Sequence, residues 1–72
     1  MTLHNRLKEI RNQKGLTQET LARTVGVTRQ TVIAVEQGRY VPSVKLALEL
    51  SAALEMPLAQ VFWIENEEGD RL

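Results

Sequence analysis

The hydrophobic residues of this chain recur in short groups at helical spacing. Leu3, Leu7 and Ile10 lie three or four positions apart and predict a helix over about residues 4–13. Later groups of the same kind predict helices over about residues 18–24, 29–36, 44–54 and 58–62. Short helices with tight connections indicate a compact all-α domain of five helices.

Residues suited to helix ends stand at the predicted boundaries. Thr17, Thr28 and Ser43 each come directly before a predicted helix, where a hydroxyl accepts a hydrogen bond from a free backbone N–H. Gly26, between the second and third helices, tolerates the positive φ that a tight turn requires. A helix, a tight turn with glycine and another helix are the outline of a helix-turn-helix unit, here over about residues 17–37.

The apolar residues exceed what one small core is expected to hold. For the fourth helix we expect an inward face of Val44, Ala47, Leu50, Ser51 and Leu54, with Leu46, Leu48, Ala52 and Ala53 off that stripe. Residues 61–65 are β-branched and aromatic, so they suit a short strand paired with residues 1–4. In the other interpretation, Trp63 and Ile64 fold onto the first helix as local core. The polar residues 66–72 are expected to fray, which leaves residues 1–65 as the domain.

The composition argues against several kinds of site. The 72 residues include no cysteine and a single histidine, His4, so we expect no disulfide, no metal site and no cofactor. His4 is expected on the surface. No apolar run approaches the roughly 20 residues of a membrane span, and no signal-peptide pattern opens the chain. We therefore expect a cytoplasmic protein without a membrane partner.

The charges divide the chain into two parts although the formal net charge is zero. Residues 1–45 carry eight basic and three acidic side chains, a net charge of +5. Residues 46–72 carry one basic and six acidic side chains, a net charge of −5. A polyanionic partner is therefore expected to meet the first two-thirds of the chain.

The stretch LTQETLARTVGVTRQTVIAVEQGRYVPS, residues 16–43, resembles the signature of the Cro and phage-repressor (XRE-like) helix-turn-helix family. The matching residues are Leu16, Thr17, Gln18, Leu21, Ala22, Gly26, Val27, Thr28, Val32, Val35, Glu36, Gly38, Pro42 and Ser43. The resemblance covers about residues 3–62 and extends to the short stand-alone repressors of that family. It implies a lambda-repressor-like fold whose third helix enters the major groove of double-stranded DNA. It also implies a location at the nucleoid.

The resemblance implies roles for individual residues at the DNA surface. Arg29 and Gln30 would contact base edges, with the choice of base reader between them left open, and Ile33 or Ala34 would contact a thymine methyl group. Phosphate contacts would come from Thr17, Gln18, Thr28, Thr31, Arg39, Tyr40 and Lys45. Thr28 and Thr31 could instead have a purely structural role, and Tyr40 could instead pack against the domain. Glu36 is expected to brace the scaffold through backbone or a basic residue.

A single module of this size makes few DNA contacts, so we expect a homodimer. Two copies on a two-fold axis place their recognition helices roughly 34 Å apart on a pseudo-palindrome. The residues expected at the dimer interface are Val41, Leu58, Phe62 and Trp63.

The sequence thus predicts a DNA-binding transcriptional regulator, and more narrowly a repressor. An antitoxin-type autoregulator is one alternative, and a helix-turn-helix module that bridges transcription factors is another. An enzyme is not expected, because the chain shows no paired carboxylates, nucleophile–base pair or metal cluster. No small-molecule ligand is expected either.

Overall fold

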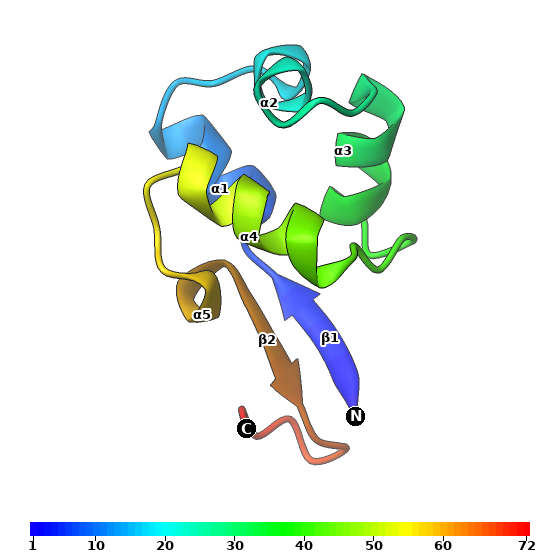
Figure 1. Ribbon diagram of the computed structural model, residues 1–72. Coiled ribbons are helices and arrows are strands. Elements are labelled where there is room, and N and C mark those ends of the chain that lie inside the picture. The colour runs from blue at the N-terminus through cyan, green and yellow to red at the C-terminus, as the bar shows by residue number, and fades with distance from the viewer.

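The computed structural model describes all 72 residues (Figure 1). The elements follow in the order β1 (Thr2–Asn5), α1 (Leu7–Gln13), α2 (Gln18–Val25), α3 (Arg29–Glu36), α4 (Val44–Ala53), α5 (Leu58–Val61) and β2 (Phe62–Glu65). Helices α1 to α4 gather at one end, and the two strands project from the other end of a molecule measuring 36 × 20 × 19 Å. The predicted five helices and the small two-stranded sheet are confirmed.

The predicted helix caps are confirmed. The Thr17 hydroxyl accepts a hydrogen bond from the Thr20 N–H, and the Thr28 hydroxyl accepts one from the Thr31 N–H. Ser43 does the same for α4. Gly26 has a φ of 74°, in the left-handed region that the turn between α2 and α3 requires. These local contacts place α2 and α3 within one residue of their predicted bounds.

The helix predicted over about residues 4–13 starts earlier than α1 of the structure, which begins at Leu7. Residues 2–5 form β1, antiparallel to β2, with Leu3 opposite Ile64 and His4 opposite Trp63. Asn5 separates strand from helix, because its Oδ1 accepts from the Leu7 N–H and its Nδ2 donates to the Val35 carbonyl. The interpretation of Trp63 and Ile64 as core against the first helix is therefore wrong, since both lie in the sheet.

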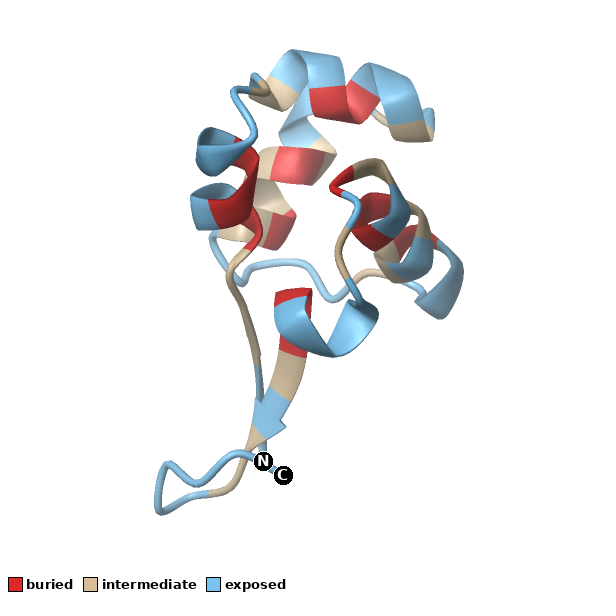
Figure 2. Ribbon diagram, turned by 90° about the vertical axis from the view of Figure 1, so that its left-hand side faces the viewer, coloured by how far each residue is buried: buried red, intermediate tan, exposed pale blue.

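The core is one cluster of apolar residues between the helices (Figure 2). Its fully or nearly buried members are Leu7, Ile10, Leu21, Ala22, Val32, Val35, Leu46, Leu50, Leu54, Val61 and Phe62. Two expectations for α4 are wrong: Leu46 is buried, whereas Val44 is 74% exposed. The reason is that α4 packs against α2 and α5 with the stripe Leu46, Leu50 and Leu54. Val44, the first residue of α4, lies off that stripe.

The last residues turn back along the sheet. Glu65 faces Arg71 in an isolated antiparallel bridge, and the Leu72 N–H donates to the Ile64 carbonyl. The division into a domain of residues 1–65 and a frayed tail stays a prediction. None of the helices combines the length and apolar composition that a membrane crossing requires.

Candidate nucleic-acid interface

The first turn of α3 presents polar side chains to solvent. Thr28, Arg29 and Gln30 are exposed, whereas Val32 and Val35 fix the other side of the helix in the core. The Thr28 and Thr31 hydroxyl oxygens lie 3.1 Å apart, and Thr28 also accepts from the Thr31 N–H. This contact uses one of the two hydroxyl hydrogens, and Arg29 and Gln30 make no side-chain hydrogen bond to the rest of the protein.

A polar hollow of about 620 Å³ lies beside this turn, between the end of α1 and the start of α2. It brings Thr17 and Gln18 of α2 next to Arg29 of α3. The other lining residues are Arg11, Asn12, Gly15, Leu16 and Glu19. The N-terminus of a helix offers free N–H groups and a positive partial charge to an anion. The hollow therefore has the shape and polarity to receive a phosphate group.

A buried network holds the hollow and α3 together. Glu36 Oε2 accepts from Arg11 Nε at 2.7 Å, and Oε1 accepts from Gln18 Nε2 at 3.0 Å. Arg11 Nη1 also donates to the Leu16 carbonyl at 2.8 Å. Glu36 therefore braces the scaffold through a basic residue, as predicted. It also orients the Gln18 amide, whose second N–H hydrogen is left for a ligand.

Sequence reasoning missed the role of Arg11. This side chain is only 8% exposed and forms the closest ion pair in the structure. One signal was available: Arg11 lies four residues after Leu7, on the stripe of the helix that is buried. A basic residue at such a position needs a buried acidic partner, and the carboxylate of Glu36 is that partner.

The remaining predicted DNA contacts follow the exposed turn along the chain. Ile33 and Ala34 are partly buried, so part of each side chain faces outward. Arg39, Tyr40 and Lys45 are exposed after the end of α3. Arg39 Nε donates to Gln37 Oε1 at 2.8 Å, and Lys45 Nζ pairs with Glu49 Oε1 at 3.1 Å.

The predicted dimer residues come together around an apolar hollow of about 380 Å³. Its lining consists of Leu3, Val41, Pro42, Val44, Ala47, Leu58, Phe62, Trp63 and Ile64, which we call the apolar face. Val41 is 69% exposed, whereas Phe62 is 8% exposed and belongs mainly to the core. Leu3, Val44 and Ile64 were missed, because their exposure follows from the sheet and from the true orientation of α4.

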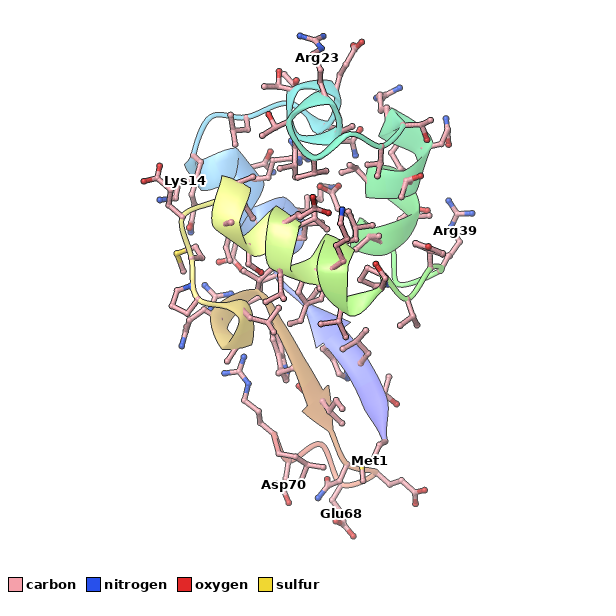
Figure 3. The ribbon with its side chains drawn as sticks, viewed as in Figure 1. Met1, Lys14, Arg23, Arg39, Glu68 and Asp70 are labelled. Carbon is pink, nitrogen blue, oxygen red and sulfur yellow. The ribbon has the colours of Figure 1, made fainter.

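Some of the basic and acidic side chains lie far apart in the molecule. Arg23 lies at the α2 end and Arg39 beside α3, whereas Glu68 and Asp70 lie beyond the far end of the sheet (Figure 3). The polar hollow and the exposed turn of α3 are therefore at the basic end.

Comparisons with known proteins point to one family. The model of the helix-turn-helix family HTH_3 matches residues 7–61. Over 65 residues the chain is 52% identical to YgzD of Bacillus subtilis, named an HTH-type transcriptional regulator, and covers 98% of that protein with 90% of its own length. A regulator of the same type from Methanocaldococcus jannaschii is 42% identical over 66 residues, which are 92% of this chain and all of that protein.

A solved structure agrees with these relatives. The restriction-modification controller protein C.AhdI from Aeromonas hydrophila superposes with a TM-score of 0.73 at 42% sequence identity. The superposition covers 76% of this chain and 80% of that one. Fold and sequence therefore identify the same group of proteins.

Proposed function

We propose that this chain, which belongs to the helix-turn-helix family HTH_3, is a repressor that binds a pseudo-palindromic operator as a homodimer. Its membership confirms the family that the sequence resembles. The family and the named relatives support the coarser statement that it is a DNA-binding transcriptional regulator. The observation that carries the proposal is the polar hollow at the start of α2, directly beside the exposed first turn of α3.

The polar hollow is proposed to seat one phosphate of the DNA backbone. Thr17 and the N–H groups of the first turn of α2 line it, and the Glu36 contact holds Gln18 in place to donate to a phosphate oxygen. Further phosphate contacts are proposed for Thr28, Thr31, Arg39, Tyr40 and Lys45. Such contacts set the register of the protein on DNA without reading its sequence.

Base reading is proposed for the exposed turn of α3. Gln30 is exposed and lies outside the lining of the hollow, so its amide is free to bond adenine N6 and N7. Arg29 lines the hollow beside Thr17 and Gln18. We therefore assign Arg29 to the backbone side of the interface and Gln30 to the base edges. The proposal thus gives base reading to Gln30 and phosphate contact to Arg29, a choice that the sequence alone left open.

Ile33 and Ala34 supply an apolar surface next to this turn. Both are partly exposed, and neither is a member of the core cluster. Contact with a thymine methyl group is the base contact that an apolar side chain makes in the major groove. Replacing thymine by uracil removes only that methyl group. Wild type should lose affinity at one operator position on this replacement, and Ile33→Asn should not. If Ile33→Asn unfolds the protein and leaves binding by the folded fraction unchanged, the residue is core.

The homodimer is proposed to form through the apolar face. None of its lining residues is charged, so two identical copies meet there without like-charge repulsion. Leu3, Val41, Val44, Leu58 and Ile64 are each at least 38% exposed. Burying such a patch is favourable by about 25 cal/mol per Å² of apolar area. Two copies also supply the area of roughly 1,000–2,500 Å² that specific DNA binding needs.

Val44→Glu tests the dimer, because it places a charge on the apolar face at a residue outside the core. The variant should sediment as a monomer and bind a palindromic operator more weakly than wild type. Leu48→Glu is the matched control, since Leu48 is also exposed on α4 but does not line the apolar face. A wild-type protein that sediments as a monomer at micromolar concentration contradicts the homodimer.

Selection from random duplexes, followed by a gel shift at increasing salt, tests the DNA-binding proposal. We expect a preferred palindrome whose affinity falls steeply with salt, because phosphate contacts release counterions. Arg29→Ala should weaken binding to all sequences and make the salt dependence shallower. Gln30→Ala should relax the preference at one base pair per half-site by about 1–3 kcal/mol. Lys8→Ala removes the same charge as Arg29→Ala from outside the polar hollow and is the control. Absence of any sequence preference would indicate a module that binds proteins.

A further inference from the structure

The outer edge of β2 is occupied by the C-terminal residues. The Ile64 carbonyl points away from β1 and accepts from the Leu72 N–H at 2.9 Å. The Asn66 N–H donates to the Asp70 carbonyl at 2.9 Å, on the other side of the Glu65–Arg71 bridge. Residues 70–72 thus cover the end of the β2 edge that faces away from β1, through one isolated bridge and two backbone hydrogen bonds.

Side chains hold this segment in place. The Arg71 guanidinium carbon lies 4.1 Å from the ring centroid of Trp63, which is a cation–π contact. Trp63 Nε1 in turn donates to Glu65 Oε2 at 2.8 Å. Asn66 Oδ1 accepts from the N–H groups of Glu68 and Asp70 and so forms the turn that leads back to the sheet.

The outer edge of β1 is flanked by a different segment. A hollow of about 250 Å³ separates β1 from the loop after α3, with Thr2 and Leu3 on one side and Tyr40, Val41 and Pro42 on the other. A further strand reaching this edge has to enter between β1 and that loop. At the β2 edge, the segment in hydrogen-bond contact is residues 70–72.

An open edge at β2 would favour pairing between molecules. Unpaired N–H and C=O groups on an edge strand are a template for another strand. The β2 sequence Phe-Trp-Ile-Glu is aromatic and β-branched, which is typical of segments that pair in this way. The partner that is always present at equal concentration is a second copy of this chain, paired through its own β2.

We propose that residues 66–72 are an edge guard, which prevents β2 from pairing with the β2 of another copy and so limits association to the apolar face. The limit on assembly rests on the dimer proposed above, whereas the guard itself rests on the sheet alone. A subunit with two different two-fold interfaces assembles beyond the dimer, into a closed tetramer where the axes allow closure and into an open chain where they do not. With the guard in place only one interface is available, and association ends at the dimer.

The test is a chain that ends at Asp70, which lacks the Glu65–Arg71 bridge, the Leu72 hydrogen bond and the Arg71 contact with Trp63 but keeps the turn. Sedimentation at several concentrations is compared with wild type and with Glu67→Gln, a tail variant whose side chain makes no hydrogen bond or ion pair in the structure. We expect the shortened chain to form larger, concentration-dependent species with an infrared signal of intermolecular β-sheet. Glu67→Gln should behave as wild type does.

The outcomes separate the guard from the dimer. A dimeric wild type with a variant that assembles beyond the dimer supports both proposals. A monomeric wild type with a dimeric variant supports the guard and overturns the dimer. A shortened chain that sediments as wild type does overturns the guard. Larger species of a folded variant without the β-sheet signal also overturn it, because that association does not use the β2 edge. Loss of the near-ultraviolet signal of folded Trp63 indicates unfolding, and the full-length variant Arg71→Ala then replaces the shortened chain: larger species with the β-sheet signal support the guard, and sedimentation like wild type overturns it.

Discussion

The two ends of the molecule each contain a contact between a basic side chain and a carboxylate; the two contacts differ in burial, and the one on the sheet is an ion pair only when His4 is protonated. Arg11 and Glu36, behind the helix-turn-helix unit, have side chains that are 8% and 3% exposed and lie 2.7 Å apart. His4 and Glu65, on the sheet, are 42% and 27% exposed and lie 3.4 Å apart. A buried charge has no water to replace a lost partner, whereas an exposed charge does. The contact behind the helix-turn-helix unit is therefore costly to break, whereas the exposed contact on the sheet can be replaced by water at small cost.

Among the substitutions that test this difference in burial, Arg11→Ala is expected to have the largest effect on stability. The substitution leaves the Glu36 carboxylate buried with Gln18 as its remaining side-chain partner. Removing one member of a buried pair typically costs about 3–5 kcal/mol, so a loss of that size in the free energy of unfolding is expected in urea titrations. Arg6→Ala is the matched control, because Arg6 pairs with Glu9 in an exposed position. Its cost should stay below about 1 kcal/mol. Equal losses for the two variants would contradict the argument from burial.

The sequence predicts best those elements whose boundaries depend on residues nearby in the chain. α2 and α3 are predicted within one residue, because Thr17, Thr28 and Gly26 act within one helical turn of themselves. The pairing of residues 1–4 with the segment after Phe62 is predicted only as one of two interpretations, because Leu3 also fits the helical spacing and its partner Ile64 is about sixty positions away. No local pattern decides between a strand and a longer first helix.

The candidate site shows the same limit. Gln18 was expected to contact phosphate and Arg29 to contact a base edge, and the structure places both at the polar hollow. The burial of Arg11 depends on Glu36, 25 residues later. On α4, the stripes that start at Val44 and at Leu46 both have helical spacing, and only the packing against α2 and α5 distinguishes them.

A smaller effect on stability is expected at the N-cap of α3, which lies in the helix-turn-helix unit but is exposed. Thr28→Ala removes the hydroxyl that accepts from the Thr31 N–H. Loss of such a cap costs about 1 kcal/mol, measurable as a lower midpoint in thermal or urea unfolding. Thr28→Ser keeps the hydroxyl and should retain most of the stability. If serine is as destabilising as alanine, the methyl group of Thr28 matters more than its hydrogen bond.

At the sheet end, Arg71→Ala should cost still less. Its guanidinium lies over the Trp63 ring, and exposed cation–π contacts contribute about 0.5–1 kcal/mol. Trp63 is the only tryptophan, so its fluorescence reports both the local change and the unfolding transition. Glu67→Gln alters a tail charge without touching Trp63 and should leave the spectrum unchanged. A loss near that of Arg11→Ala would show that the two ends are held equally firmly.

The smallest expected change in stability separates binding from folding. Lys45 is 82% exposed and pairs with Glu49 four residues later, so Lys45→Ala should cost only a few tenths of a kcal/mol in unfolding experiments. If Lys45 contacts a phosphate, its loss also lowers the slope of log affinity against log salt by about 0.9. Glu49→Gln breaks the same ion pair without removing a positive charge, so it should match Lys45→Ala in stability and leave the slope at least as steep as in wild type. A slope unchanged by Lys45→Ala would remove Lys45 from the proposed interface and leave its pair with Glu49 as a purely structural contact.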